Sequence, residues 1–168
     1  MTVTLYDATI PVCIRALENL AHLLTKGQTW ADEQGVAHFE LLDARLIEDM
    51  GALPSQIQRA SDAAKFAGAR LGQIEAPAMP DTETTFDELQ ARIAATIAFL
   101  RTVPASAIDG REDADIELKF PQGTHIFTGR DYAFKFVLPN VFFHVTTAYA
   151  LLRMKGVPVG KMDYIGAS

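Results

Sequence analysis

The chain has 168 residues, of which 49% are hydrophobic and 21% are charged, a composition that is typical of a folded globular domain and excludes a disordered chain. Its net charge of −6, without a cluster of lysines and arginines, disfavours a surface for nucleic acids or anionic membranes, because such surfaces need clustered positive charge. We therefore expect one domain over residues 1–168, with no nucleic-acid partner and no membrane partner.

The single cysteine, Cys13, excludes an intramolecular disulfide and is compatible with a reducing compartment. It lies in an apolar helical pattern, which is typical of an inert buried thiol. The N-terminal stretch has neither the basic start and apolar run of a signal peptide nor an apolar span of about 18 residues. We expect a cytoplasmic protein.

The first expected helix covers residues 5–26. Its apolar face is formed by Leu5, Ala8, Val12, Ala16, Leu20 and Leu23. Gly27 is expected to end this helix, and the polar stretch 27–35, which carries Trp30, is expected to be a loop. Pro11 has no backbone N–H, so it predicts a kink or a non-helical start near Thr9 and Ile10.

A short helix is expected over residues 36–45, and a longer second helix over residues 46–71 with Gly72 as its stop. The apolar face of the longer helix is formed by Leu46, Met50, Leu53, Ile57, Ala60, Ala64, Ala67 and Leu71. Gly51 and Pro54 weaken its first turns and indicate that the regular helix can begin later.

The stretch 73–84 contains two prolines and no periodicity, so we expect an extended connector. Twelve extended residues reach about 40 Å, whereas a 20-residue helix is about 30 Å long. The connector can therefore run the length of a bundle and leave the second and third helices parallel.

The third helix is expected over residues 85–103, where the sequence T-F-D-E predicts a capping box between Thr85 and Glu88. A β-hairpin is then expected over residues 115–127. Apolar and charged side chains alternate from Ile116 to Phe120, Pro121-Gln122-Gly123 predicts the turn, and residues 124–127 are expected to form the return strand.

The last helix is expected over residues 130–155, with Thr128 and Asp131 as its start signal and Gly156 as its stop. These elements together predict an all-α fold, a four-helix bundle with a small β-hairpin between the third and fourth helices.

His144 is the one histidine in the apolar face of this last helix. Three interpretations are open: a hydrogen-bonded core histidine, a histidine that contacts a ligand or transfers protons, and a metal ligand. None of the four histidines has another three or four residues away, the spacing of a helical metal pair. We expect no bound metal and no cofactor.

Two side chains of the second helix, Asp49 and Gln56, lie at the margin of its apolar face and can point into the bundle near His144. Tyr149 adds a polar group on the last helix. We therefore predict a ligand-binding set of His144, Asp49, Gln56 and Tyr149, with His144 and Asp49 as catalytic candidates, although no reaction follows from them. The alternative is structural: Asp49 near a helix start, a half-exposed Gln56, and a tyrosine bonded to backbone or water.

Three apolar side chains, Leu17, Leu24 and Phe39, fall outside the main core faces. Bundles commonly pair through such leftover surface, so we expect a homodimer.

Three segments carry a resemblance to known proteins. They are L-x-D-A-R-L-x-x-D-M from Leu41 to Met50, A-x-D-A-A-K from Ala60 to Lys65, and F-F-H-V-T-T-A-Y-A-L-L-R-x-K-G-V-P-V-G-K-x-D-Y-I-G from Phe142 to Gly166. Together they resemble a bacterial family of unknown function in the DinB/YfiT-like superfamily of four-helix bundles. The resemblance implies a single DinB-like domain with up-down-down-up connectivity.

Relatives in that superfamily include metal-dependent thiol transferases and isomerases that use a histidine triad. Their last helix places two of these histidines four residues apart, whereas Asn140 and Ala148 flank His144 at that spacing. The leading hypothesis is a protein that binds a small molecule near His144 without the triad. The alternatives are a non-catalytic dimeric bundle and a metal-dependent transferase of the DinB-like type.

Overall fold

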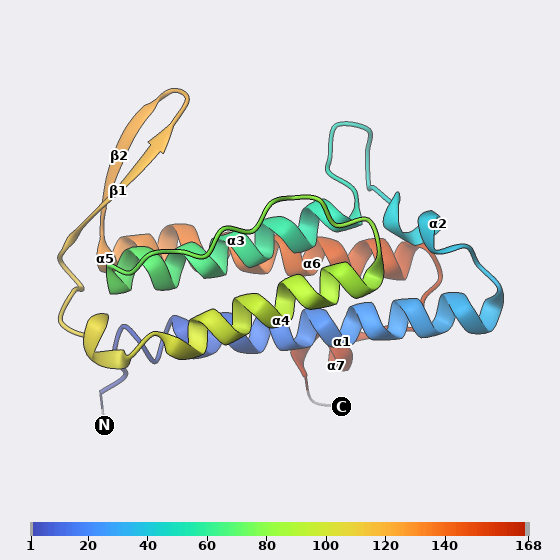
Figure 1. The fold of residues 1–168 in the computed structure, drawn as a ribbon, viewed down its shortest axis with the longest axis horizontal. Coiled ribbons are helices and arrows are strands. Elements are labelled where there is room, and N and C mark those ends of the chain that lie inside the picture. The colour runs from blue at the N-terminus through green and yellow to red at the C-terminus, as the bar shows by residue number, and fades with distance from the viewer. Residues whose placement is uncertain (1, 167–168) are drawn as a thin grey trace.

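Four long helices run side by side in the computed structural model, which describes residues 2–166 (Figure 1). They are α1 (Ile10–Gln34), α3 (Leu53–Gly72), α4 (Phe86–Thr102) and α6 (Leu138–Met154). The shorter elements are α2 (His38–Leu42), the 3₁₀ turn Ala105–Ala107, α5 (Gly129–Asp131), the π-helical segment Tyr132–Val137 and α7 (Lys161–Ile165). The strands β1 (Asp115–Phe120) and β2 (Gly123–Thr128) form one antiparallel hairpin.

The chain direction of the four helices confirms the up-down-down-up connectivity. Figure 1 shows α1 and α6 running one way and α3 and α4 the other, with the connector after α3 returning along the bundle. Helix α3 lies against α4 and α6, and α1 lies against the same two helices. Helices α1 and α3 also contact each other. Within residues 2–166, no helix is long and apolar enough to cross a membrane.

The expected end of the first helix at Gly27 is wrong. Helix α1 continues to Gln34 and ends at Gly35, whose φ of 66° is left-handed, so Trp30 lies in the helix and not in a loop. Gly27 is buried against α6, where an added Cβ would lie 2.9 Å from Cδ2 of Leu152. The glycine therefore lets two helices approach closely and does not stop one. The expected non-helical start is confirmed, since α1 begins at Ile10 with a proline in its first turn.

The second long helix begins at Leu53 and not at residue 46. Pro54 stands in its first turn, where the missing N–H is not needed, and the Leu46 side chain before it is 46% exposed. Gly72 still belongs to the helix, and the left-handed residue is Gln73, with φ of 53°. The short helix expected over residues 36–45 is limited to α2.

The capping box of α4 is confirmed by two reciprocal hydrogen bonds. The Glu88 N–H donates to Oγ1 of Thr85 (3.2 Å), and the Thr85 N–H donates to Oε2 of Glu88 (3.0 Å). The hairpin is confirmed as well: Phe120 pairs with Gly123, and the register continues to Asp115 opposite Thr128.

Leu17 and Leu24 are fully buried in the core, which contradicts their expected position outside it. Helix α1 is covered by α4 and α6, and also by α7, so more than one of its faces is apolar. Of the three residues proposed for a dimer surface, only Phe39 is exposed, at 64%.

The last helix has a π-helical segment that the sequence pattern did not indicate. Thr128 caps it as expected, with Oγ1 accepting a hydrogen bond from the Asp131 N–H (3.1 Å), and Gly156 follows its end with φ of 96°. Between these ends, residues 132–137 are π-helical, and Pro139 follows in the first turn of α6. Because proline has no N–H and its ring collides with the carbonyl four residues earlier, the wider π turn accommodates it.

Gly129 joins the hairpin to the last helix and generates a testable prediction. A Cβ at this position would overlap the backbone carbonyl oxygen of Arg111, and the next N–H, that of Arg130, donates to the Glu112 carbonyl (2.9 Å). We expect Gly129→Ala to lower the free energy of unfolding by about 1–3 kcal/mol, because a backbone atom cannot move aside as a side chain can. Urea denaturation measures this.

The matched control is Gly160→Ala, since a Cβ there would meet only Oδ2 of Asp163 at 3.9 Å. It should change the free energy of unfolding by less than about 0.5 kcal/mol. Equal stability of the two variants would contradict the proposed close approach at Gly129.

Candidate functional site

A buried hydrogen bond between α3 and α6 forms the centre of the candidate site. Nδ1 of His144 lies 2.9 Å from Oε1 of Gln56, and both residues are buried. The Gln56 amide is oriented by its other end, because Nε2 donates to the Gly51 carbonyl (2.7 Å). Oε1 must therefore accept from His144, so the ring proton lies on Nδ1 and Nε2 is left as an acceptor.

The environment of His144 keeps this ring neutral. Burial, and after it the positive charge of Arg59, lower the pKa of His144 to about 4. A ring with this pKa is neutral at physiological pH, so it is a hydrogen-bonding group and a weak base.

His144 lies at one end of an open groove of about 280 Å³ between α3 and the last helix. The groove is lined by Arg59, Asp62, Ala63, Phe66 and Arg70 of α3, Tyr132 and Phe136 of the π-helical segment, and Asn140 and His144 of α6. Its walls thus combine aromatic rings, two guanidinium groups, one carboxylate, an amide and the neutral imidazole.

The π-helical segment explains why four residues of the last helix share this groove. The four residues are spaced four apart: Tyr132, Phe136, Asn140 and His144. On an ideal α-helix, each step of four residues turns the side chain about 40° further around the helix axis, so the last would point about 120° away from the first. The π turn contains one extra residue, which reduces this rotation around the helix axis by about 100°. The four side chains therefore line one groove.

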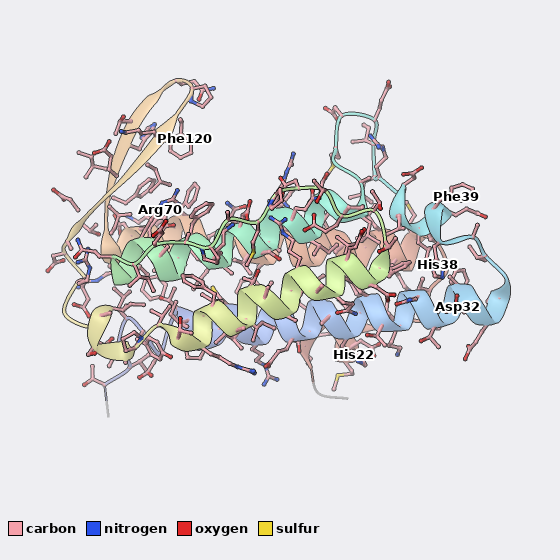
Figure 2. All side chains as sticks on the ribbon, in the orientation of Figure 1. His22, Asp32, His38, Phe39, Arg70 and Phe120 are labelled. Carbon is pink, nitrogen blue, oxygen red and sulfur yellow. The ribbon has the colours of Figure 1, made fainter. Side chains whose placement is uncertain are left out.

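The two ends of the groove differ. At the end away from His144, Nη1 of Arg70 donates to Oη of Tyr132 (2.9 Å), and its guanidinium lies over the Phe66 ring at 4.6 Å. Figure 2 shows Arg70 on α3 at the end of the bundle where the hairpin leaves it. The Tyr132 and Phe136 rings stack at 5.8 Å, and Phe136 also meets Phe127 of the hairpin at 5.9 Å.

The structure brings together two of the four predicted ligand-binding residues. Gln56 is 1% exposed, in contrast to the half-exposed alternative, and it contacts His144. Asp49 is exposed in the loop before α3 and lines a separate surface hollow with Ile47 and Glu48. Tyr149 packs against Tyr164 of α7, with ring centroids 5.9 Å apart, and does not line the groove.

Several groove residues were not predicted from the sequence: Arg59, Asp62, Phe66, Arg70, Tyr132, Phe136 and Asn140. The available signals were Pro139 within the last helix and the four-residue repeat that precedes His144. Neither signal becomes informative until the π turn is recognised, because an unbroken α-helix would spread these residues over different faces.

The donor set around His144 does not fit a resident metal ion. In the part of the chain that the structure describes, no three His, Cys, Asp or Glu side chains are grouped as a metal site requires. Asp62 is the only carboxylate in the groove lining, and it already pairs with Nζ of Lys65 (2.8 Å) and Nη2 of Arg92 (2.9 Å). Among the other histidines, His22 pairs with Asp163 and His38 with Asp32.

The comparisons with known proteins agree with the fold. The model of a family described as a domain of unknown function, DUF1993, matches residues 5–165. The crystal structure of a DinB family member from Shewanella denitrificans is similar, with 39% sequence identity, a TM-score of 0.88, and coverage of 98% of this chain and 93% of that one. No curated protein matches the chain.

The hydrogen bond to Gln56 predicts both the tautomer and the titration of His144. At neutral pH we expect a proton on Nδ1 and none on Nε2, with protonation only as the pH approaches 4. ¹⁵N NMR of the histidine rings measures both. A protonated Nε2, or a midpoint near the ordinary value of 6.5, would contradict this geometry.

The same shift predicts how stability depends on pH. The unfolded chain takes up this proton near 6.5 and the folded chain only near 4, so the unfolded state binds more protons between these values. Stability should therefore fall as the pH is lowered through this window. In His144→Gln this contribution should be absent, so wild type should lose more stability than the variant between about pH 7 and about pH 5 in urea denaturation.

Proposed function

The chain belongs to the DUF1993 family, a DinB-like family of unknown function, and we propose that it binds a small molecule in the groove beside His144 without using a metal. The observation that carries this proposal is the hydrogen-bonded chain from the Gly51 carbonyl through Gln56 to His144. It fixes one acceptor, Nε2, on a ring that lines an open groove.

A purely structural role explains less of this arrangement. A histidine that only fills a core needs hydrogen-bond partners inside the protein for both ring nitrogens. Among the described residues, the His144 ring forms one such bond, at Nδ1, and Nε2 has no protein partner. The residues around it also leave a groove of about 280 Å³, close to the lower end of the range for small-molecule sites. A ligand with an O–H or N–H group would satisfy the remaining nitrogen.

The chemical role that we propose for His144 is recognition. With a pKa of about 4, its imidazole is a poor general base near neutral pH, so a hydrogen bond to the ligand is favoured over proton abstraction. The metal-dependent transferase reading is less favoured, because Asn140 accompanies His144 in the groove and the Asp62 carboxylate is held by two cations.

A dimeric bundle remains the second candidate, and it is favoured by apolar side chains on the surface of α6. Phe142 is 39% exposed and Phe143 is 56% exposed, next to each other in the sequence. Sedimentation at high micromolar concentration distinguishes the candidates: a dimer that is lost in Phe143→Glu would support pairing through this surface, and a monomer would exclude it.

Removal of the imidazole tests the proposed function. We expect compounds that bind the wild type in a thermal-shift screen of a small-molecule library to bind His144→Ala about tenfold more weakly or not at all, because Nε2 is lost as an acceptor. His22→Ala is the matched control, since His22 lies on α1 and is 45% exposed at its side chain.

Elemental analysis of untagged protein belongs to the same experiment. We expect no stoichiometric zinc, nickel or iron in the wild type and no change in His144→Ala. About one metal ion per chain, lost in that variant, would restore the metalloenzyme hypothesis. Compounds that bind wild type and variant equally would show that His144 takes no part in binding.

A further inference from the structure

We propose that the ligand of this groove is a small organic anion with a planar apolar part, and that its charged end binds Arg70. This inference rests on the proposed function and adds the chemical class of the ligand. It follows from three features of the groove: an uncompensated positive charge, a fixed guanidinium and an aromatic wall.

The positive charge arises because the groove is lined by two guanidinium groups and one carboxylate, and that carboxylate pairs with cations from outside the groove. Asp62 pairs with Lys65 and with Arg92, both of which are buried and neither of which lines the groove. Among residues 2–166, Arg59 and Arg70 form no ion pair of their own. A protein with a net charge of −6 thus keeps two free guanidinium groups in one groove.

Arg70 is held in place before any ligand binds. Its guanidinium lies 4.6 Å from the Phe66 ring centre and 5.8 Å from that of Tyr132, and Nη1 donates to the Tyr132 hydroxyl (2.9 Å). The remaining N–H groups at the edge of this plane are available for a carboxylate or phosphate oxygen. A guanidinium that is already ordered loses less conformational entropy on binding than a free one.

The neighbouring wall favours a flat apolar group attached to the anion. Phe66 and Phe136 line the groove from opposite helices, and Phe136 is supported by Tyr132 at an interplanar angle of 18°. Aromatic faces of this kind pack against planar ligands. Arg59 lies at the His144 end, eleven residues or about 16 Å along α3 from Arg70, so one small carboxylate contacts only Arg70.

A matched pair of probes tests the charge. Cinnamate is planar, apolar and anionic, and cinnamamide has nearly the same shape without the charge. In titrations followed by NMR, including the side-chain Nε–H signal of Arg70, we expect cinnamate to bind about tenfold more tightly than cinnamamide, and more weakly at high salt. Acetate, an anion without a ring, should bind more weakly than cinnamate.

Substitutions distinguish a role of Arg70 in anion binding from a role in folding. Arg70→Gln should weaken cinnamate about tenfold and leave cinnamamide within about twofold. Arg59→Gln, at an exposed position, lowers the charge of the groove without removing a contact to the carboxylate, so it should weaken cinnamate by less than Arg70→Gln. Arg153→Gln removes an exposed arginine of α6 outside the groove and should change neither affinity. Thermal melting of each variant shows that it is folded.

The outcomes distinguish this inference from the function on which it rests. Cinnamamide that binds as tightly as cinnamate would overturn the anion preference and leave a small-molecule groove. Acetate that binds as tightly as cinnamate would overturn the role of the aromatic wall. If no probe shifts the groove signals at about 10 mM, the inference about the anion is wrong, whereas the proposed function is tested separately by the loss of binding in His144→Ala.

Discussion

The buried hydrogen bond between His144 and Gln56 constrains the site more than any other contact. It joins α3 to α6, two helices that come from distant parts of the chain and run in opposite directions. A buried polar group without its partner costs about 1–3 kcal/mol, so any shift of one helix along the other would leave two such groups unsatisfied. The relative position of the two groove walls, and therefore the shape of the groove, depends on this bond.

A second buried network, centred on Arg92, holds the connector before α4 and also pairs with a carboxylate of the groove. Arg92 of α4 binds Asp62 of α3 and also Asp81 and Glu83 of the connector, each at 2.9 Å, and Nη1 donates to the Pro80 carbonyl (3.2 Å). These contacts attach the connector to the bundle, which permits α3 and α4 to be parallel. Because Arg92 also pairs with Asp62, the groove arginines form no ion pair with that carboxylate. The path of the connector and the ion pairs of Asp62 thus depend on one side chain.

Most features that depend on neighbouring residues in the sequence were predicted, and most features that depend on distant residues were not. Thr85 and Thr128 cap their helices as expected, because a cap needs only the next turn of the same segment. Gly27 was interpreted as a helix stop because the sequence does not show Leu152 beside it. His144 and Gln56 were predicted to be close, since both lie near apolar faces. The orientation of the Arg70 side chain depends on Phe66 of its own helix and on Tyr132 of the last helix. No local sequence pattern indicates that Tyr132 lies beside Arg70.

The π-helical segment gives the last helix two faces that can be set independently. In a helix of uniform pitch, the angle between two side chains around the axis is fixed by the number of residues between them. A rotation that points one end of the helix at its neighbour therefore also rotates the other end. Here the extra residue between Tyr132 and Val137 acts as a rotational offset. Deletion of a single residue within it would turn Tyr132 and the hairpin by about 100° relative to His144 and would take the aromatic wall out of the groove. In this fold, the number of residues in the π-helical segment therefore sets the angle at which the aromatic rings of the groove face His144.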